Sequence, residues 1–186
     1  MSFGIKFEII ENLFFKTMFV LLSGELRIKF LRLYGIKIGK GCEIHSTEFS
    51  TEPFLIEIGD HVAIASGTIF VTHDGSVRIM RDTIPEIDLF GPIKIGNNTF
   101  IGMESILLPN TTIGSNCIIG AGSVVRGVIP DDSVVFGNPA KVIMKTSMIK
   151  SMFICHKNCL KTKHLSKRRK MKIIKDHFKS FYERTS

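Results

Sequence analysis

The stretch from residue 95 to residue 125, IGNNTFIGMESILLPNTTIGSNCIIGAGSVV, repeats with a period of six. An aliphatic residue opens each repeat, at Ile95, Ile101, Leu107, Ile113, Ile119 and Val125. Glycine follows four of these anchors, and a small residue stands four positions after most of them. A helix would space the anchors by about 3.6 residues and an ordinary amphipathic strand by about 2. A period of six therefore predicts a coil of flat faces, each six residues long, with the anchors pointing inward.

Three such faces make one triangular turn, and stacked turns pair as parallel strands about 4.8 Å apart. The pattern returns upstream in two stretches that are out of phase, with anchors at Ile38, Ile44, Ile58, Ile64 and Phe70. The phase slips predict a bulge or loop over 45–57 and a long protruding loop over 74–92. Loops of more than about 12–15 residues are usually functional. The segment 134–145 is expected to leave the last turn, with Asn138-Pro139 ending regular pairing.

Three segments carry a resemblance to a known family: Phe100-Ile101-Gly102, Ile118 to Val125 and Gly137 to Ile143. In order and spacing they resemble the C-terminal signature of the hexapeptide-repeat acyltransferases. Together with the stretch from Val71 to Ser76, they resemble the branch that acetylates sugars in capsule and lipopolysaccharide assembly. The resemblance implies a left-handed parallel β-helix, an all-β core that is an exception to the right-handed crossover rule.

Charge is distributed unevenly along the 186 residues. Residues 1–145 carry 13 Lys and Arg against 15 Asp and Glu, whereas residues 146–186 carry 12 against 2. The basic character therefore belongs to the tail. Four cysteines do not make a disulfide scaffold, and charged residues interrupt the apolar N-terminal segment well before the roughly 20 residues needed to span a bilayer. We expect a cytoplasmic protein with three parts: a helical segment over 1–35, the β-helix over 36–145 and a tail over 146–186.

The two appendages are both expected to be helical. Residues 3–34 are apolar around much of a helical circumference, which predicts burial against the end of the prism, against an oligomer partner or in a membrane interface. The tail combines a basic run at 167–172 with apolar residues at helical spacing, and so predicts a basic amphipathic helix. Contact with an anionic membrane or polysaccharide is favoured over nucleic acid, and packing in an oligomer is the third alternative.

His73 is the first candidate for catalysis because it ends a coil face and opens the long loop. Acyl transfer to a hydroxyl requires a base, and histidine serves as one near neutral pH. In the family that the sequence resembles, a histidine opening such a loop is the general base. Asp74 could orient the imidazole or form an Asp-Gly turn. Glu104 could orient His73 or the acceptor from a neighbouring subunit, or be a solvated surface residue.

The resemblance implies acetyl-CoA as the donor, lying in a groove between two parallel prisms. Small residues would let pantetheine approach the backbone, and the candidates are Gly102, Gly120, Ala121 and Ser123. Each glycine equally suits a tight corner. Cations for the phosphates are expected at Arg126, Lys141 and Lys145. No nucleophile stands out, which favours direct transfer over an acyl-enzyme.

The loop over 74–92 is assigned to acceptor recognition, with Arg78 and Arg81 available to an acidic sugar. Phe100 could pack on the acceptor or on pantetheine, or belong to the core. A metal is not expected: the three prism histidines, His45, His61 and His73, lie in three separate coil segments, and the Cys and His residues over 155–164 match no common zinc spacing.

Together with the family resemblance, these observations predict an acetyl-CoA-dependent O-acetyltransferase for a sugar hydroxyl in surface polysaccharide. One prism offers only one wall of a cleft, and the resemblance implies a homotrimer in which adjacent subunits supply both walls of each active site. Peripheral contact with the inner face of the membrane through the tail is a further expectation, and no nucleic-acid partner is expected. The alternatives are N-acetylation of a nucleotide-linked amino sugar and a non-catalytic assembly module.

Overall fold

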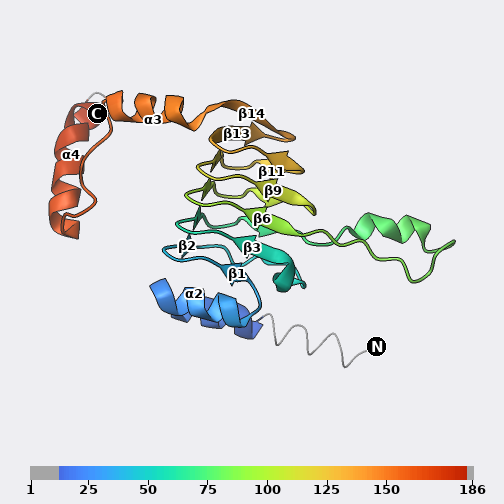
Figure 1. Cartoon of the computed structure of the whole chain (residues 1–186). Coiled ribbons are helices and arrows are strands. Elements are labelled where there is room, and N and C mark those ends of the chain that lie inside the picture. Colours follow the sequence, from blue (N-terminus) through green and yellow to red (C-terminus); the bar gives the residue numbers. More distant parts are fainter. Residues whose placement is uncertain (1–12, 184–186) are drawn as a thin grey trace. The chain divides into compact units, whose positions relative to one another are not determined.

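The computed structural model describes residues 13–183, with side chains described as far as Lys179. Short strands wind into a three-sided parallel β-helix whose faces are three sheets (Figure 1). The first sheet contains β1 (Lys37–Ile38), β3 (Ile56–Ile58), β6 (Ile93–Ile95), β9 (Thr111–Ile113) and β12 (Val128–Ile129). The second contains β2 (Glu43–Ile44), β4 (Ala63–Ile64), β7 (Phe100–Ile101), β10 (Ile118–Ile119), β13 (Ser133–Gly137) and β14 (Ala140–Lys145). The third contains β5 (Ile69–Phe70), β8 (Ile106–Leu107) and β11 (Val124–Val125).

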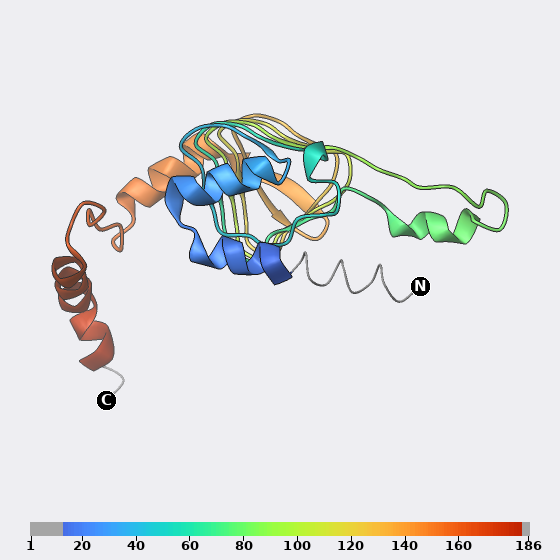
Figure 2. The same ribbon diagram turned by 90° about the horizontal axis from the view of Figure 1, so that it is seen from below.

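The six-residue anchors form the core of the prism. Parallel pairing sets Ile64 beside Ile101, Ile101 beside Ile119 and Ile119 beside Val135. The side chains therefore stack in columns inside the coil, and Figure 2 looks along this stack so that the coils superpose. All six anchors between 95 and 125 are buried, at 3% exposure or less. The predicted coil of inward-pointing anchors is confirmed.

Small polar residues hold the corners between faces. Ser105 is fully buried, and its hydroxyl donates to the carbonyl oxygens of Gly102 at 2.9 Å and Gly120 at 3.1 Å, on successive coils. Thr111 does the same at the next corner, toward Leu108 and Val125. Buried carbonyls need such partners. The small residues of the repeat therefore satisfy corner carbonyls as well as filling limited space.

The N-terminal segment forms two helices, one over 13–21 and α2 (Gly24–Leu33), that cover the first coil. Leu31 and Phe19 are buried in the same core cluster as the coil anchors. The predicted helical segment is confirmed in its described part, where it consists of two helices because the helix is interrupted at residues 22–23. Arg27 stabilises this break: its Nε donates to the carbonyls of Phe19 and Leu22 at the end of the first helix. The portion over 1–12 lies outside the described residues.

The other end of the prism is closed by a hairpin. β13 pairs parallel with β10 on one side and antiparallel with β14 on the other. The turn between β13 and β14 contains a cis Asn138–Pro139 peptide. The expectation that pairing ends at Asn138-Pro139 is therefore wrong, since the chain reverses there and adds one more strand to the sheet.

The long loop leaves the coil between β5 and β6 and projects from it (Figure 1). Its neck is closed by backbone hydrogen bonds, from Asp74 to Leu89 and from Gly91 to Thr72, each at 2.8 Å. The loop carries a 3-10 helix, η2 (Gly75–Met80). The predicted protrusion thus has a paired base, which holds the residues at its neck against the coil.

The chain divides into two compact units, residues 1–149 and residues 150–186. α3 (Thr146–Cys155) crosses this division, and α4 (Lys167–Glu183) lies in the second unit. α4 is the basic amphipathic helix that the sequence predicts. Within residues 13–183, no helix is long and apolar enough to cross a bilayer.

Candidate active site

A cleft of about 390 Å³ lies at the neck of the long loop. One wall comes from the segment between β2 and β3, which contributes Thr51 and Glu52. The other comes from the loop itself, through His73, Asp74, Gly75, Val77, Arg78, Arg81, Asp88, Leu89 and Phe90. The segment between β2 and β3 runs along β5, because Glu48 pairs with Ile69, the first residue of that strand. The structure thus places His73 in a hollow at an edge of the prism.

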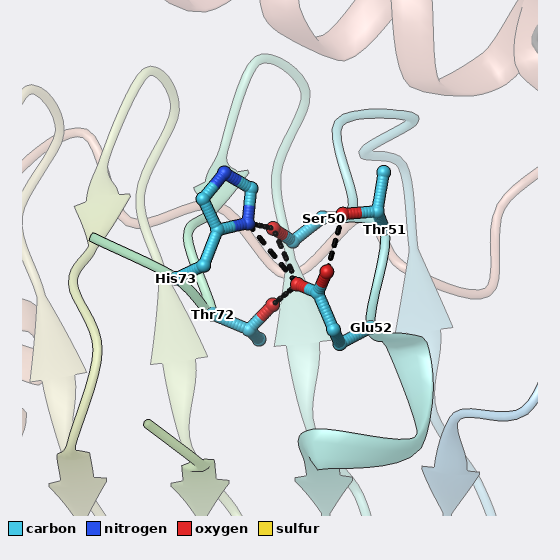
Figure 3. Close-up of polar contacts among 5 residues, drawn as sticks. All are labelled: Ser50, Thr51, Glu52, Thr72 and His73. Atoms are coloured by element: carbon cyan, nitrogen blue, oxygen red, sulfur yellow. Dashed lines mark hydrogen bonds and ion pairs between the residues drawn. The ribbon is translucent and has the colours of Figure 1, made fainter. Parts of the chain in front are cut away.

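The ring of His73 is hydrogen-bonded to a carboxylate, that of Glu52. Its Nδ1 lies 3.1 Å from Oε2 of Glu52 and 3.3 Å from Oγ of Ser50 (Figure 3). An ionised carboxylate only accepts hydrogen bonds, so Nδ1 carries the proton toward Glu52. In the neutral ring Nε2 is then the nitrogen without a proton, and Figure 3 shows it pointing away from Glu52. This tautomer is the one that a general base requires.

Glu52 is anchored by its own set of donors. Its side chain is 17% exposed, whereas that of His73 is 46% exposed. Thr72 donates to Oε2 at 2.7 Å and Thr51 donates to Oε1 at 2.5 Å. Burial acts to raise the pKa of Glu52, but hydrogen bonds from Thr51, Thr72 and His73 together lower it below the usual glutamate range. Glu52 is therefore ionised at neutral pH and fixed in position before any substrate arrives.

Sequence reasoning missed Glu52. The residue lies in the segment over 45–57, which the sequence identified only as a break in the six-residue repeat. The sequence offered one indication of its role: Glu52 is a carboxylate in the segment that interrupts the six-residue repeat, one turn of the coil before the histidine that opens the long loop. Its distance from His73, 21 positions along the chain, gives no hint of contact until the coil is closed.

Asp74 does not take the orienting position that the sequence suggested. It caps η2, accepting the backbone N–H of Ser76 at 3.0 Å, and pairs with Arg126 at 3.6 Å. Hydrogen bonds from Ser76 lower the pKa of Asp74, and Arg126 adds a smaller attraction. The turn-forming alternative for Asp74 is the one that the structure supports.

Glu104 lies at a different edge of the prism from His73. It has a left-handed backbone conformation at the corner between the second and third sheets, where the neighbouring coils carry Gly67 and Gly122. Its carboxylate covers Gly67, and a Cβ on Gly67 would meet it. Glu104 therefore cannot orient the His73 of its own chain, and its action on a neighbour's site stays a prediction.

The small residues expected to contact the donor lie at this same corner. Gly102, Gly120 and Ser123 are buried, whereas Ala121 is exposed. The hydroxyl of Ser123 donates to the Gly120 carbonyl at 2.7 Å and accepts the N–H of Gly137 at 3.2 Å. Gly102 packs against the backbone of Ala121 in the next coil. Their small size is explained by coil stacking, and Ala121 is the one of the four accessible from outside this chain.

The three expected phosphate-binding cations are not gathered in one place. Arg126 follows β11 and faces Asp74, while Lys141 and Lys145 lie near opposite ends of β14. In the loop, Arg81 pairs with Asp88 at 2.8 Å, and Arg78 lines the cleft beside His73.

Phe100 is 46% exposed on the outer face of β7, which excludes the core alternative. All four cysteines are free thiols, with Cys42 and Cys117 buried. Burial raises the pKa of both buried thiols. Residues 13–183 contain no group of three or more side chains suited to hold a metal ion.

A prism of six-residue repeats with a histidine in a cleft at its edge defines a hexapeptide-repeat transferase. The family model described as bacterial transferase hexapeptide (six repeats) matches residues 92–127. Protein CapG of Staphylococcus aureus is 45% identical over 116 residues, which span 61% of this chain and 67% of CapG. The chain belongs to the hexapeptide-repeat acyltransferase family and is an acyltransferase. The expected left-handed parallel β-helix is thereby confirmed.

Other relatives agree with this family. A probable acetyltransferase of Mycobacterium tuberculosis, Rv3034c, is 32% identical over 148 residues, covering 57% of this chain and 48% of that protein. The crystal structure of a maltose O-acetyltransferase from Clostridium difficile 630 is 29% identical, with a TM-score of 0.56 over 74% of this chain and 87% of that one. An acetyltransferase from Vibrio cholerae complexed with acetyl-CoA shares the fold, with a TM-score of 0.59 and 22% identity over 78% of this chain and 91% of that one.

Proposed function

We propose that this chain transfers an acetyl group from acetyl-CoA to a sugar hydroxyl during synthesis of a bacterial surface polysaccharide, either capsule or lipopolysaccharide O-antigen. The observation that carries the proposal is the Glu52–His73 pair in the cleft at the loop neck. The relative named CapG supports a capsular product, and the maltose O-acetyltransferase supports a sugar hydroxyl as the acceptor.

His73 acts as the general base in a direct transfer. Nε2 of His73 takes the proton of the acceptor hydroxyl as its oxygen bonds to the thioester carbonyl carbon. The carbon–sulfur bond then breaks, and the proton on Nε2 passes to the departing thiolate of CoA. Glu52 holds Nδ1–H and stabilises the imidazolium that exists between these steps. No acyl-enzyme forms in this mechanism, so acetyl-CoA and the acceptor must be bound at the same time.

The neighbouring protomer of a trimer completes the cleft. His73 lies at the edge between the third and first sheets, whereas Ala121 lies at the edge between the second and third. A single prism cannot bring both edges to one substrate. Three parallel prisms around a common axis would set one edge of each chain against another edge of the next, so that the donor lies along the seam. Phe100 and Arg78 are exposed and available to the acceptor.

Replacing His73 tests the proposal. His73→Ala should lower kcat by about 10²–10⁴-fold, the usual contribution of a general base, while the fold and the oligomer stay intact. His45→Ala is the matched control, because His45 is also an exposed prism histidine but lies outside the cleft. Wild-type turnover in His73→Ala would remove the mechanism.

The acceptor is identified in the producing cell. Mass spectrometry of the surface glycan should show one acetyl group fewer per repeat when the gene is deleted, with restoration by the wild-type and His45→Ala chains and not by His73→Ala. Fragmentation then locates the modified hydroxyl. An unchanged glycan after deletion would contradict the assignment to surface polysaccharide.

A further inference from the structure

The net positive charge of this protein belongs to one of its two compact units. Residues 1–149 carry 13 Lys and Arg against 15 Asp and Glu, and residues 150–186 carry 12 against 2. The division between the units thus coincides with the change in charge. The catalytic cleft lies wholly in the first unit, so the basic unit needs a role of its own.

Three basic residues of α4 form a row along one face of the helix. Arg168, Lys172 and Lys175 are four and three residues apart, so they follow one another on the same side. With Ser166, Arg169, Met171 and the single acidic residue Asp176, they line an open hollow of about 550 Å³. The helix has 17 residues and is therefore about 25 Å long. A row of this length presents several cations at once to an extended anionic surface.

An exposed apolar row runs beside the basic one. Met171 follows Arg168 by three residues and precedes Lys175 by four, so it adjoins the basic row. Met171 is 50% exposed and Ile174 is 37% exposed. The opposite side of α4 is occupied within its own unit, where Nε2 of His177 lies 3.1 Å from Oδ1 of Asn158.

We propose that α4 docks the protein on an anionic phospholipid surface, lying in the plane of the interface. The basic row contacts the phosphate-bearing headgroups, and Met171 and Ile174 enter the boundary with the acyl chains. Amphipathic helices that bind membranes combine these two properties. A nucleic acid or an acidic polysaccharide would be bound by the cations alone and leave the apolar row in water. The two rows together therefore favour lipid.

Sedimentation with vesicles tests the docking on the full-length chain. Vesicles of phosphatidylcholine with 30% phosphatidylglycerol should bind the protein at low salt, and pure phosphatidylcholine vesicles should not. Each basic residue near an anionic leaflet contributes roughly 1 kcal/mol. The triple variant Arg168→Gln, Lys172→Gln, Lys175→Gln should therefore bind about 100-fold more weakly. The matched control, Lys29→Gln, Lys37→Gln, Lys94→Gln, removes the same charge from exposed positions of the first unit and should bind as the wild type.

An apolar variant separates lipid from other anions. Ile174→Gln keeps every charge and should weaken vesicle binding severalfold, while leaving binding to polyglucuronate or to a DNA oligonucleotide unchanged. Wild-type vesicle binding by the triple variant, or by Ile174→Gln, would overturn the proposal. So would polyglucuronate or DNA binding tighter than vesicle binding. Acetylation of a dissolved acceptor should persist in all these variants, so failure of the docking is distinguishable from failure of the proposed chemistry.

Discussion

Glu52→Gln should lower kcat by about 10- to 150-fold while leaving the β-helix folded. The carboxylate accepts from Nδ1 of His73 at 3.1 Å and from Thr72 at 2.7 Å. Glutamine has the same shape and retains one oxygen, so it can still accept from the buried Thr72. It loses the charge, however, so Nδ1 of His73, which shares Oε2 with Thr72, donates to a neutral amide oxygen in place of a carboxylate. A hydrogen bond to a charged group is worth about 1.5–3 kcal/mol, and this range sets the expected loss in rate.

The assay follows release of free CoA thiol with acetyl-CoA and the acceptor found for the wild type. Glu57→Gln is the matched control, since Glu57 is an exposed glutamate in the middle of β3 and loses the same charge. KM should change little, because Glu52 acts on His73 and not on the substrate. Glu52→Asp keeps the charge on a shorter side chain and should be intermediate.

Nitrogen-15 NMR of the histidine rings supplies a readout that a purely structural role would not move. In the wild type His73 should carry its proton on Nδ1, and in Glu52→Gln the Nε2 tautomer should gain population. A Glu52→Gln variant that retains wild-type kcat and the wild-type tautomer would refute the assignment of Glu52 as the residue that positions His73.

The remaining predictions concern stability. Gly96→Ala should lower Tm by roughly 3–10 °C, because its Cβ would lie 2.6 Å from the backbone of Gly114 and Ser115 in the next coil, and overpacking costs about 1–3 kcal/mol. Gly75→Ala has open space around the new Cβ and should melt like the wild type; equal melting of the two variants would contradict close stacking of the coils. Because the folded-state pKa of Glu52 is lowered, its contribution to stability is complete above the usual glutamate range and disappears as the pH falls through the lowered folded-state pKa. Denaturant titrations from pH 7 to pH 3 should therefore show a smaller acid loss in Glu52→Gln than in the wild type, and identical pH profiles would count against that stabilisation.

The repeat itself made the core predictable. Inward anchors, small corner residues and a long insertion after Phe70 are all local properties of spacing, so one pass along the chain locates them. The location of His73 was predictable for the same reason, since it stands where a coil face ends and the insertion begins, whereas its role as the base was inferred mainly from the family resemblance and stays a proposal. The two-helix cap and the closing hairpin were less accessible. The cap depends on Arg27, whose side chain donates hydrogen bonds to the end of the first helix. The hairpin depends on pairing of β14 with the free edge of β13. Both are tertiary contacts that the local sequence pattern does not specify.

The amino-acid order alone determined a coil, its core residues, the edge that bears the histidine and the separation of charge between the two ends of the chain. Tertiary structure decided which carboxylate reaches that histidine. Asp74 is adjacent in sequence, but its backbone directs it to Ser76 and Arg126, whereas Glu52 arrives from the preceding turn. The reason is that each turn of the coil brings together residues about 20 positions apart, and irregular segments such as 45–57 have no repeat from which their contacts could be counted.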